Sequence, residues 1–263
     1  MANLLLFLYN FFYNLFKVND KKIAIIIGIN YNYSNINRLN GCINDTNNII
    51  DLLINFYNYK RENIYLLNDI TLIKPTKNNI LNIFNFVLTQ CTDTESIFFY
   101  YSGHSANGSL LTYDNEELYN YEIIEIFIKK IPKNIIFYSI FDCCQSENFF
   151  NLKYYWYKQK WHKTESNNKT ESNNKIESNN LIILSACCKY ENTYEINIDN
   201  TETNNEGLFT NSILKILKQD KNISWATLLN KVNVLYKMNN LQYVPTPIFS
   251  SIKLINMNNI CNF

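Results

Sequence analysis

Apolar stretches alternate with amphipathic stretches along most of the chain. Short runs rich in Ile, Phe and Tyr are typical of buried strands, whereas apolar residues that recur every three or four positions are typical of helices. The predicted strands are residues 23–28, 63–67, 96–102, 134–142 and 181–187, with a last extended piece at 246–252. The predicted helices are residues 44–56, with Asn44 as the cap, and 76–88, 118–130, 207–218 and 224–237. This alternation predicts an α/β fold in which a mostly parallel sheet is covered by helices on both faces.

The pattern breaks at a threefold repeat of six residues. Residues 163–180 read Lys-Thr-Glu-Ser-Asn-Asn twice and then Lys-Ile-Glu-Ser-Asn-Asn. Such hexamers bury almost no apolar surface, so they predict a flexible linker. We therefore divide the chain into an N-terminal apolar segment (1–20), a large part (21–157), a linker (158–180) and a small part (181–263). Because the small part has only one or two predicted strands, we expect it to complete the sheet of the large part.

The first 16 residues carry no charge and are apolar, aromatic or Asn. They are fewer than the ~20 residues that a membrane-spanning helix needs, and they lack the basic start of a secretory signal. Two interpretations stay open. The segment packs on the domain or frays, or it makes an interfacial contact with a membrane or a partner.

Composition limits the class of protein further. The chain is 47% hydrophobic, which suits a sizeable core, and its net charge of +1 gives no electrostatic reason for a nucleic-acid partner. It has seven Cys, without zinc-type spacing or a regular disulfide framework. Free thiols in a reducing compartment are the simplest interpretation, so we expect a cytoplasmic protein.

Two strand ends carry the candidate chemistry. His104 follows the predicted strand 96–102, and Cys144 follows the predicted strand 134–142. The carboxyl ends of parallel strands meet at one edge of a sheet, where sites form, and a Cys needs a nearby base such as His to become a thiolate. Taken alone, a Cys is more often a small core residue than a nucleophile, which is the reading for Cys143. The other histidine, His162, adjoins the repeat and is a poor candidate.

The chain resembles the metacaspases, a family of caspase-like cysteine peptidases. The resemblance covers roughly residues 22–255 and rests on several segments in the family's order. These are 25–31 and 39–45 (first strand and Gly-Cys-x-Asn-Asp), 99–104 (Tyr-Ser-Gly-His), 141–144 (Asp-x-Cys), 183–187 and 242–251. It implies a caspase-like three-layer αβα sandwich that acts as a monomer. In a monomer the sheet edge that true caspases use to dimerise must be covered.

The resemblance also implies an endopeptidase with a Cys-His dyad. His104 would be the general base and acid, Cys144 the nucleophile, and the backbone N–H groups of Ser105 and Cys144 would stabilise the oxyanion. It implies cleavage of proteins or peptides after Arg or Lys, with a specificity pocket formed by Cys42, Asp45, Ser102 and Asp142. Paired acids in a partly desolvated pocket favour a guanidinium or ammonium group.

Several of these residues also have plainer interpretations. Asp45 could solvate or cap a helix, and Asp142 could be an ordinary carboxylate at a strand end. Three lysines of the linker are either solvated charges or sites of self-cleavage: Lys163, Lys169 and Lys175.

The motifs depart from the family pattern beside both members of the dyad. Ser105 stands where the family usually has Gly, and its side chain could narrow the cleft. Gln145 and Glu147 replace the usual His and Gly after the nucleophile. These departures motivate an alternative: a catalytically weak or inactive homologue that acts as a regulator or scaffold. A nucleotide-binding domain is disfavoured because no Gly-rich phosphate loop follows the first strand.

Many metacaspases need calcium, which a cluster of carboxylates holds. Here the segment 118–122 and positions 148 and 151 offer Asn and Tyr where acids are expected. Asp114 and Glu122 remain, and a hard cation wants more charged oxygen ligands than these two supply. We therefore expect no metal site, no cofactor, and weak or absent calcium dependence.

Overall fold

A computed structural model describes residues 22–32, 37–165, 176, 180–199, 201, 204–239 and 241–263. The N-terminal segment 1–16, with its two interpretations, lies outside these residues. Within the described part of the chain, no helix combines the length and the apolar character that crossing a membrane requires.

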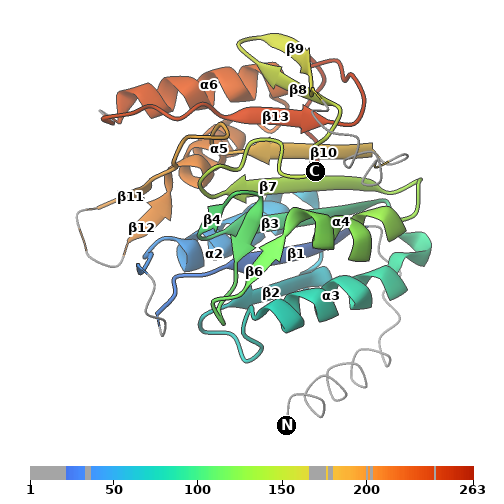
Figure 1. Ribbon diagram of the computed structural model, residues 1–263. Helices are drawn as coiled ribbons and strands as arrows, with labels where there is room; N and C mark the ends of the chain where they lie inside the picture. Colours follow the sequence, from blue (N-terminus) through green and yellow to red (C-terminus); the bar gives the residue numbers. More distant parts are fainter. Residues whose placement is uncertain are drawn as a thin grey trace.

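The centre of the molecule is a sheet of eight strands in the order β2-β1-β3-β7-β10-β13-β8-β9 (Figure 1). Their bounds are β1 Lys22–Gly28, β2 Ile64–Asn68, β3 Ser96–Ser102, β7 Ile136–Asp142, β8 Tyr154–Tyr157, β9 Lys160–Lys163, β10 Asn180–Ser185 and β13 Ile248–Ser251. The strands from β2 to β10 pair in parallel, and β13, β8 and β9 pair antiparallel. The mostly parallel sheet agrees with the prediction.

Helices cover both faces of this sheet and form two separate apolar cores. The helices are α2 Cys42–Tyr57, α3 Lys77–Thr89, α4 Asn120–Ile126, α5 Leu208–Gln219 and α6 Trp225–Met238, with 3-10 turns at Arg61–Asn63, Cys91–Asp93 and Ile128–Lys130. In β1, alternate residues face opposite sides: Ala24 and Ile26 join the core under α2, α5 and α6, and Ile23, Ile25 and Ile27 join the core under α3 and α4. The three-layer αβα sandwich is therefore confirmed.

Two small sheets stand beside the main one. The first contains β4 Ser105–Ala106, β5 Ser109–Leu111 and β6 Glu117–Tyr119, and the second contains β11 Glu195–Asn197 and β12 Asn205–Gly207. Between β4 and β5 lie Asn107 and Gly108, both with positive φ (51° and 78°). Asn-Gly with positive φ at both positions is the turn that a two-residue hairpin favours, so β4 leaves His104 along a fixed path.

Three local predictions differ from the structure. Residues 160–163, assigned to the linker, form strand β9, because the aromatic strand β8 pairs with them and Trp161 packs on Trp156 and Phe249. The segment predicted as one helix at 118–130 begins in strand β6 and ends in a 3-10 turn. Helix α2 starts at Cys42, and Asn44 does not cap it, because its amide donates to Asn205 O.

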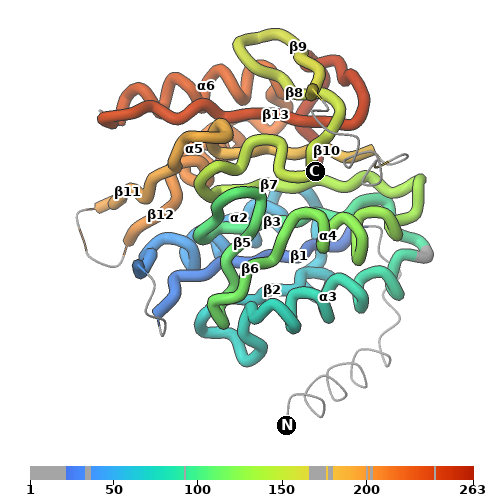
Figure 2. The backbone as a smooth tube through the Cα atoms, viewed as in Figure 1, coloured from blue at the N-terminus to red at the C-terminus, as the bar shows by residue number. Residues whose placement is uncertain are grey.

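The hairpin of β8 and β9 covers the far side of β13. After β7 the chain forms this hairpin at one edge of the sheet (Figure 2), and β10, which pairs with β7, follows the hairpin in the sequence. Strand β13 consequently has a neighbour on each side, β10 and β8.

Candidate active site

Strands β3 and β7 bring His104 and Cys144 to the same edge of the sheet. The two strands are adjacent and parallel, and their last residues, Ser102 and Asp142, lie opposite each other. His104 and Cys144 each follow two residues later, so matching register places them together. Both line one cavity of about 330 Å³.

The imidazole of His104 is oriented through a backbone carbonyl. Its Nε2 lies 2.6 Å from Asn37 O. A carbonyl oxygen only accepts hydrogen bonds, so Nε2 carries the hydrogen, and in a neutral ring Nδ1 is then the nitrogen that can accept a proton. The ring also stacks on Tyr31, with centroids 4.8 Å apart and planes at 29°.

Tyr31 and Tyr101 fix the backbone of this histidine. The hydroxyl of Tyr31 accepts the His104 N–H at 2.9 Å, and the hydroxyl of Tyr101 donates to His104 O at 2.7 Å. Tyr31 has a φ of 59°, a conformation that non-glycine residues adopt at a cost and that often marks functional sites. Sequence analysis did not identify Tyr31 or Asn37 as site residues, because neither carries reactive chemistry.

The thiol of Cys144 is half-buried, whereas Cys143 is fully buried in the core, as predicted. Burial raises the pKa of the Cys144 thiol, and the backbone N–H of Thr193 partly opposes that effect. The thiol therefore rests in its neutral form at neutral pH and needs a proton acceptor such as His104 to become a nucleophile.

The register of β4 frees the N–H group of Ser105. Ser105 lies opposite Leu110, and Leu111 N–H donates to His104 O at 3.0 Å, so Ser105 and Leu110 form a non-hydrogen-bonded pair. In such a pair each N–H points away from the partner strand. This direction agrees with the predicted oxyanion role of Ser105, which stays a prediction.

Two buried carboxylates form the floor of the same cavity. Asp45 accepts hydrogen bonds from Ser102 Oγ and from Gly207 N–H, each at 2.9 Å. Asp142 accepts hydrogen bonds from the N–H (2.9 Å) and hydroxyl (2.8 Å) of Thr210 and from Thr193 Oγ1 (3.1 Å). These donors are all neutral, so hydrogen bonds hold both carboxylates in place without cancelling their charge.

Burial makes both carboxylates weaker acids than usual. It raises the pKa of Asp45 well above its ordinary value, and the negative charge of Asp142 adds to this effect. It raises the pKa of Asp142 to about 6, although the hydrogen bonds from Thr210 and Thr193 oppose the shift. A positive charge that entered the cavity would favour the ionised form of both.

All four predicted pocket residues line this cavity, together with residues that sequence analysis missed. The lining comprises Leu39, Cys42, Asp45, Ser102, Gly103, His104, Asp142, Cys144, Asn192, Thr193, Tyr194, Glu195 and Gly207. Glu195 adds a third carboxylate, which accepts hydrogen bonds from the N–H groups of Asn40 (2.9 Å) and Gly41 (2.6 Å). A side chain at Gly207 would collide with the carboxylates of Asp142 and Asp45, so glycine makes room for the pair.

Comparison with known proteins identifies the family. A family model described as Caspase domain matches residues 21–256. The chain belongs to the caspase-domain family. Metacaspase-1B of Neurospora crassa is 30% identical over 155 residues, which cover 52% of this chain and 36% of the relative. Metacaspase-1 of Schizosaccharomyces pombe is 30% identical over 166 residues, which cover 55% of this chain and 38% of the relative. These relatives identify the domain as one of the metacaspase type, and it spans a little over a third of their length.

Solved structures support the caspase fold. Caspase-1 from Spodoptera frugiperda superposes with a TM-score of 0.63 at 12% identity, covering 89% of this chain and 87% of that chain. Protein GSU0716 from Geobacter sulfurreducens superposes with a TM-score of 0.60 at 13% identity, covering 91% of this chain and 97% of that chain. At such low identity the likeness concerns the fold alone.

The lysines proposed as self-cleavage sites of this caspase domain are not equivalent. Lys163 lies in β9, paired with Tyr154. The next residue, Thr164, donates its N–H to Lys153 O at 3.0 Å and its hydroxyl to Leu152 O at 2.6 Å. The N–H group of the Lys163–Thr164 peptide bond is therefore engaged in the pairing of β8 and β9. Lys169 and Lys175 lie outside the described residues.

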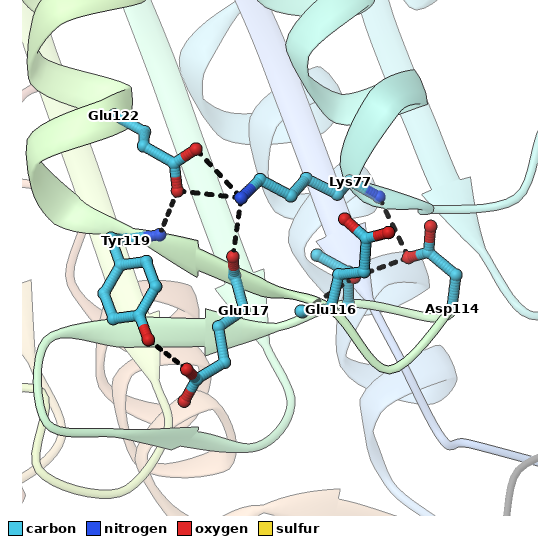
Figure 3. Close-up of polar contacts among 7 residues, drawn as sticks. Lys77, Asp114, Glu116, Glu117, Tyr119 and Glu122 are labelled. Carbon is cyan, nitrogen blue, oxygen red and sulfur yellow. Dashed lines mark hydrogen bonds and ion pairs between the residues drawn. The ribbon is translucent and has the colours of Figure 1, made fainter.

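Lys77 binds both acids that remained as candidate calcium ligands, Asp114 and Glu122 (Figure 3). The Lys77 ammonium pairs with Glu122 at 2.8 Å and donates to Glu117 O at 2.9 Å, while the Lys77 backbone N–H donates to Asp114 at 3.0 Å. Within the described residues, no group of three or more His, Cys, Asp or Glu side chains is arranged to hold a metal ion.

Asn120 lies in the same segment, 118–122, where calcium ligands were expected. Its amide donates to Phe149 O at 2.9 Å, so it joins the start of α4 to the segment after the nucleophile. Asn148 binds the backbone of Leu152 through both of its amide atoms, at 2.9 Å and 2.7 Å. Neutral amides thus make direct protein contacts at these positions, where a calcium ion would want charged oxygen ligands.

Burial of the two carboxylates leads to a prediction about how stability depends on pH. Asp45→Asn removes a charge that burial disfavours while keeping the shape of the side chain. In the wild type, Asp45 is protonated at low pH and carries no buried charge. The free energy of unfolding therefore falls as the pH rises through the raised pKa of Asp45. The variant should therefore be more stable than wild type, by a margin that is larger at pH 8 than at pH 5.

Urea unfolding at the two pH values measures this margin. Asp51→Asn, which changes an exposed carboxylate of the same helix, is the matched control and should change the stability only slightly. If the gain in unfolding free energy from Asp45→Asn is equal at both pH values, or negative at pH 8, then burial of the Asp45 charge does not destabilise the protein.

Proposed function

We propose that this protein is a cysteine endopeptidase that cleaves peptide bonds after Arg or Lys. The observation that carries the proposal is the composition of a single cavity. A thiol, an imidazole and two buried carboxylates, those of Cys144, His104, Asp45 and Asp142, line it together.

The carboxylates support a preference for a basic residue before the scissile bond. Both are held by neutral donors, and burial disfavours their charge, so a cationic side chain that enters recovers electrostatic energy. A guanidinium can meet two carboxylates with several N–H groups at once, and an ammonium can meet them as a point charge. An acidic side chain in the same place would meet like charge. The residues of the pocket therefore favour Arg or Lys over Asp.

The proposed reaction follows from the roles of the two reactive side chains. His104 Nδ1 takes the proton of the Cys144 thiol, and the sulfur attacks the scissile carbonyl carbon. The oxygen becomes an oxyanion, which the N–H groups of Ser105 and Cys144 stabilise. His104 then gives its proton to the leaving amine, which frees the new N-terminus and leaves a thioester on Cys144. Water, deprotonated by His104, hydrolyses the thioester and regenerates the thiol.

The proposal includes activity without calcium, as a monomer. Lys77 and Asn120 support calcium independence, because they engage an acid and a carbonyl in the segments where calcium ligands were expected. Pairing of β8 with β13 supports a monomer, because it covers a sheet edge that another copy could otherwise extend. All seven cysteines are free thiols, which supports a reducing compartment such as the cytoplasm.

Cleavage of fluorogenic peptides tests the function directly. Peptides that end in Arg or Lys before the fluorophore should be cleaved, and peptides that end in Asp should not. Cys144→Ala and His104→Ala should each lose essentially all turnover. A chelator such as EGTA should leave the wild-type rate unchanged.

The outcomes separate the possibilities. Turnover of Asp peptides would overturn the pocket assignment, and full loss with chelator would overturn calcium independence. A folded wild type that cleaves no peptide would favour the inactive regulator or scaffold, for which Ser105 and Gln145 are the motive.

Asp142 predicts a pH dependence of specificity. With a pKa of about 6, its carboxylate is charged above that pH and neutral below it. The preference for an Arg peptide over the matching citrulline peptide, which is uncharged, should therefore fall on the order of tenfold between pH 7.5 and pH 5. Taking the ratio of kcat/KM values cancels the titration of the dyad. In Asp142→Asn the ratio at pH 7.5 should be lower than in wild type, and an unchanged ratio in this variant would contradict the assignment.

Self-cleavage in the linker, also proposed here, should occur after Lys169 or Lys175 and spare Lys163. Lys163 lies in the β8–β9 hairpin, and the Thr164 N–H is already bonded to Lys153 O, so this peptide bond resists the extended binding that a peptidase requires. Mass spectrometry of an incubated sample identifies the cut. A Lys169→Gln/Lys175→Gln variant should stay intact, whereas Lys163→Gln should be cut like wild type. Cleavage after Lys163, or in Cys144→Ala, would refute this.

Light scattering of the uncut sample should give the mass of one chain.

A further inference from the structure

The turn that carries the nucleophile is bonded directly to the strand that follows His104. The hydroxyl of Ser105 donates to Cys144 O. Two residues after Ser105 and one residue after Cys144, Asn107 N–H donates to Gln145 Oε1 at 3.2 Å. Ser105 and Gln145 are the two residues that depart from the family pattern beside the dyad, and these two hydrogen bonds join their segments. We call this pair of bonds the Ser105–Gln145 latch.

The strand side of the latch is rigid. Ser105 and Asn107 belong to the hairpin of β4 and β5, whose turn at Asn107 and Gly108 has the conformation suited to two-residue hairpins. Asn120 N–H donates to Gly108 O at 2.9 Å, which ties the turn of this hairpin to the start of α4. The hydroxyl of Ser105 is thus carried by a braced hairpin, so it can impose a position on its acceptor.

The nucleophile side needs such support. Gln145 has a φ of 53°, a left-handed conformation that is unfavourable for a residue with a side chain and persists where the surroundings determine it. Asn107 holds the Gln145 side chain, and Gln145 N–H donates to Glu191 O at 3.0 Å. The peptide between Cys144 and Gln145 therefore lies between bonds from the large part and a bond from the small part.

We propose that Ser105 is a positioning residue for the nucleophile. Its hydroxyl fixes the carbonyl of Cys144, and this sets the thiol relative to His104 in the proposed peptidase, on which the inference rests. The sequence alone allowed the opposite effect, a side chain that narrows the cleft and lowers activity. The two effects differ in sign: removing the hydroxyl slows a latched enzyme and speeds a crowded one.

Ser105→Ala tests the sign. A misplacement of a reacting group by about 1 Å costs up to about 100-fold in rate, so loss of one positioning bond should lower kcat by about tenfold, with KM within about twofold. The pH profile of iodoacetamide alkylation, followed by mass spectrometry on the peptide that contains Cys144, should shift as well. Ser105→Thr, which keeps the hydroxyl on a strand-favouring residue, should restore most of the rate.

Ser109→Ala is the matched control. Ser109 lies on the neighbouring strand β5, and its buried hydroxyl makes two hydrogen bonds within the same small sheet. A purely structural effect would appear in this variant too. It should lose stability while keeping kcat and the Cys144 alkylation profile of wild type.

The result is overturned if Ser105→Ala matches or exceeds the wild-type kcat, or if Ser109→Ala loses as much as Ser105→Ala. If even wild type cleaves no peptide, the proposed function fails, but alkylation still tests the latch, because it needs no turnover. An unchanged Cys144 alkylation profile in Ser105→Ala would then overturn it.

A double variant tests whether the two bonds act as one unit. Since both bonds hold the same turn, the losses of Ser105→Ala and Gln145→Ala in kcat or alkylation rate should be less than additive on a logarithmic scale. Additive losses would mean that the bonds act independently and would overturn the latch.

Discussion

Burial of two neighbouring carboxylates is the constraint on which the site depends. Asp45 and Asp142 lie almost fully out of water, at 0% and 4% exposure, so every group around them has to supply a hydrogen bond or space. Ser102, Thr193 and Thr210 supply hydroxyls, and Gly207 supplies an N–H and the absence of a side chain. The pair costs free energy in the empty protein, and in the proposed function a cation of the substrate would relieve this cost.

The donors come from distant parts of the chain, so the pocket also joins the two parts of the molecule. Ser102 ends a strand of the large part, whereas Thr193, Gly207 and Thr210 belong to the small part. Glu195 strengthens this junction by accepting the N–H groups of Asn40 and Gly41 at the start of α2. The proposed specificity pocket and the interface between the parts are therefore one structure, and a change in either affects both.

The sequence predicted the parts of this fold that depend on local patterns. Each of strands β1, β3 and β7 is a continuous apolar run. Their alternation with helices predicted that they are parallel, and parallel strands bring His104 and Cys144 to one edge of the sheet. The hairpin of β4 and β5 was missed although Asn107-Gly108 is a strong local signal for it. Strand β9 has no such signal, because it is a strand through its pairing with β8. Thr193 and Glu195 could not be predicted, because only tertiary packing brings them to residues about 50 and 150 positions away. Asn44 looked like a cap, and its amide instead found a partner in the small part.

The order of strands has a further consequence for the linker. Strands β10 and β13 of the small part lie side by side, with β7 on one side and β8 on the other, and both of these flanking strands belong to the large part. The small part is therefore enclosed on two sides by the segment that precedes it. Cutting the linker would change the number of chains without separating the pieces, since release would require two strand pairings in the middle of the sheet to open together. Any effect of such a cut has to come from the new chain ends it creates, and dissociation of a subunit is not available to this topology as a switch.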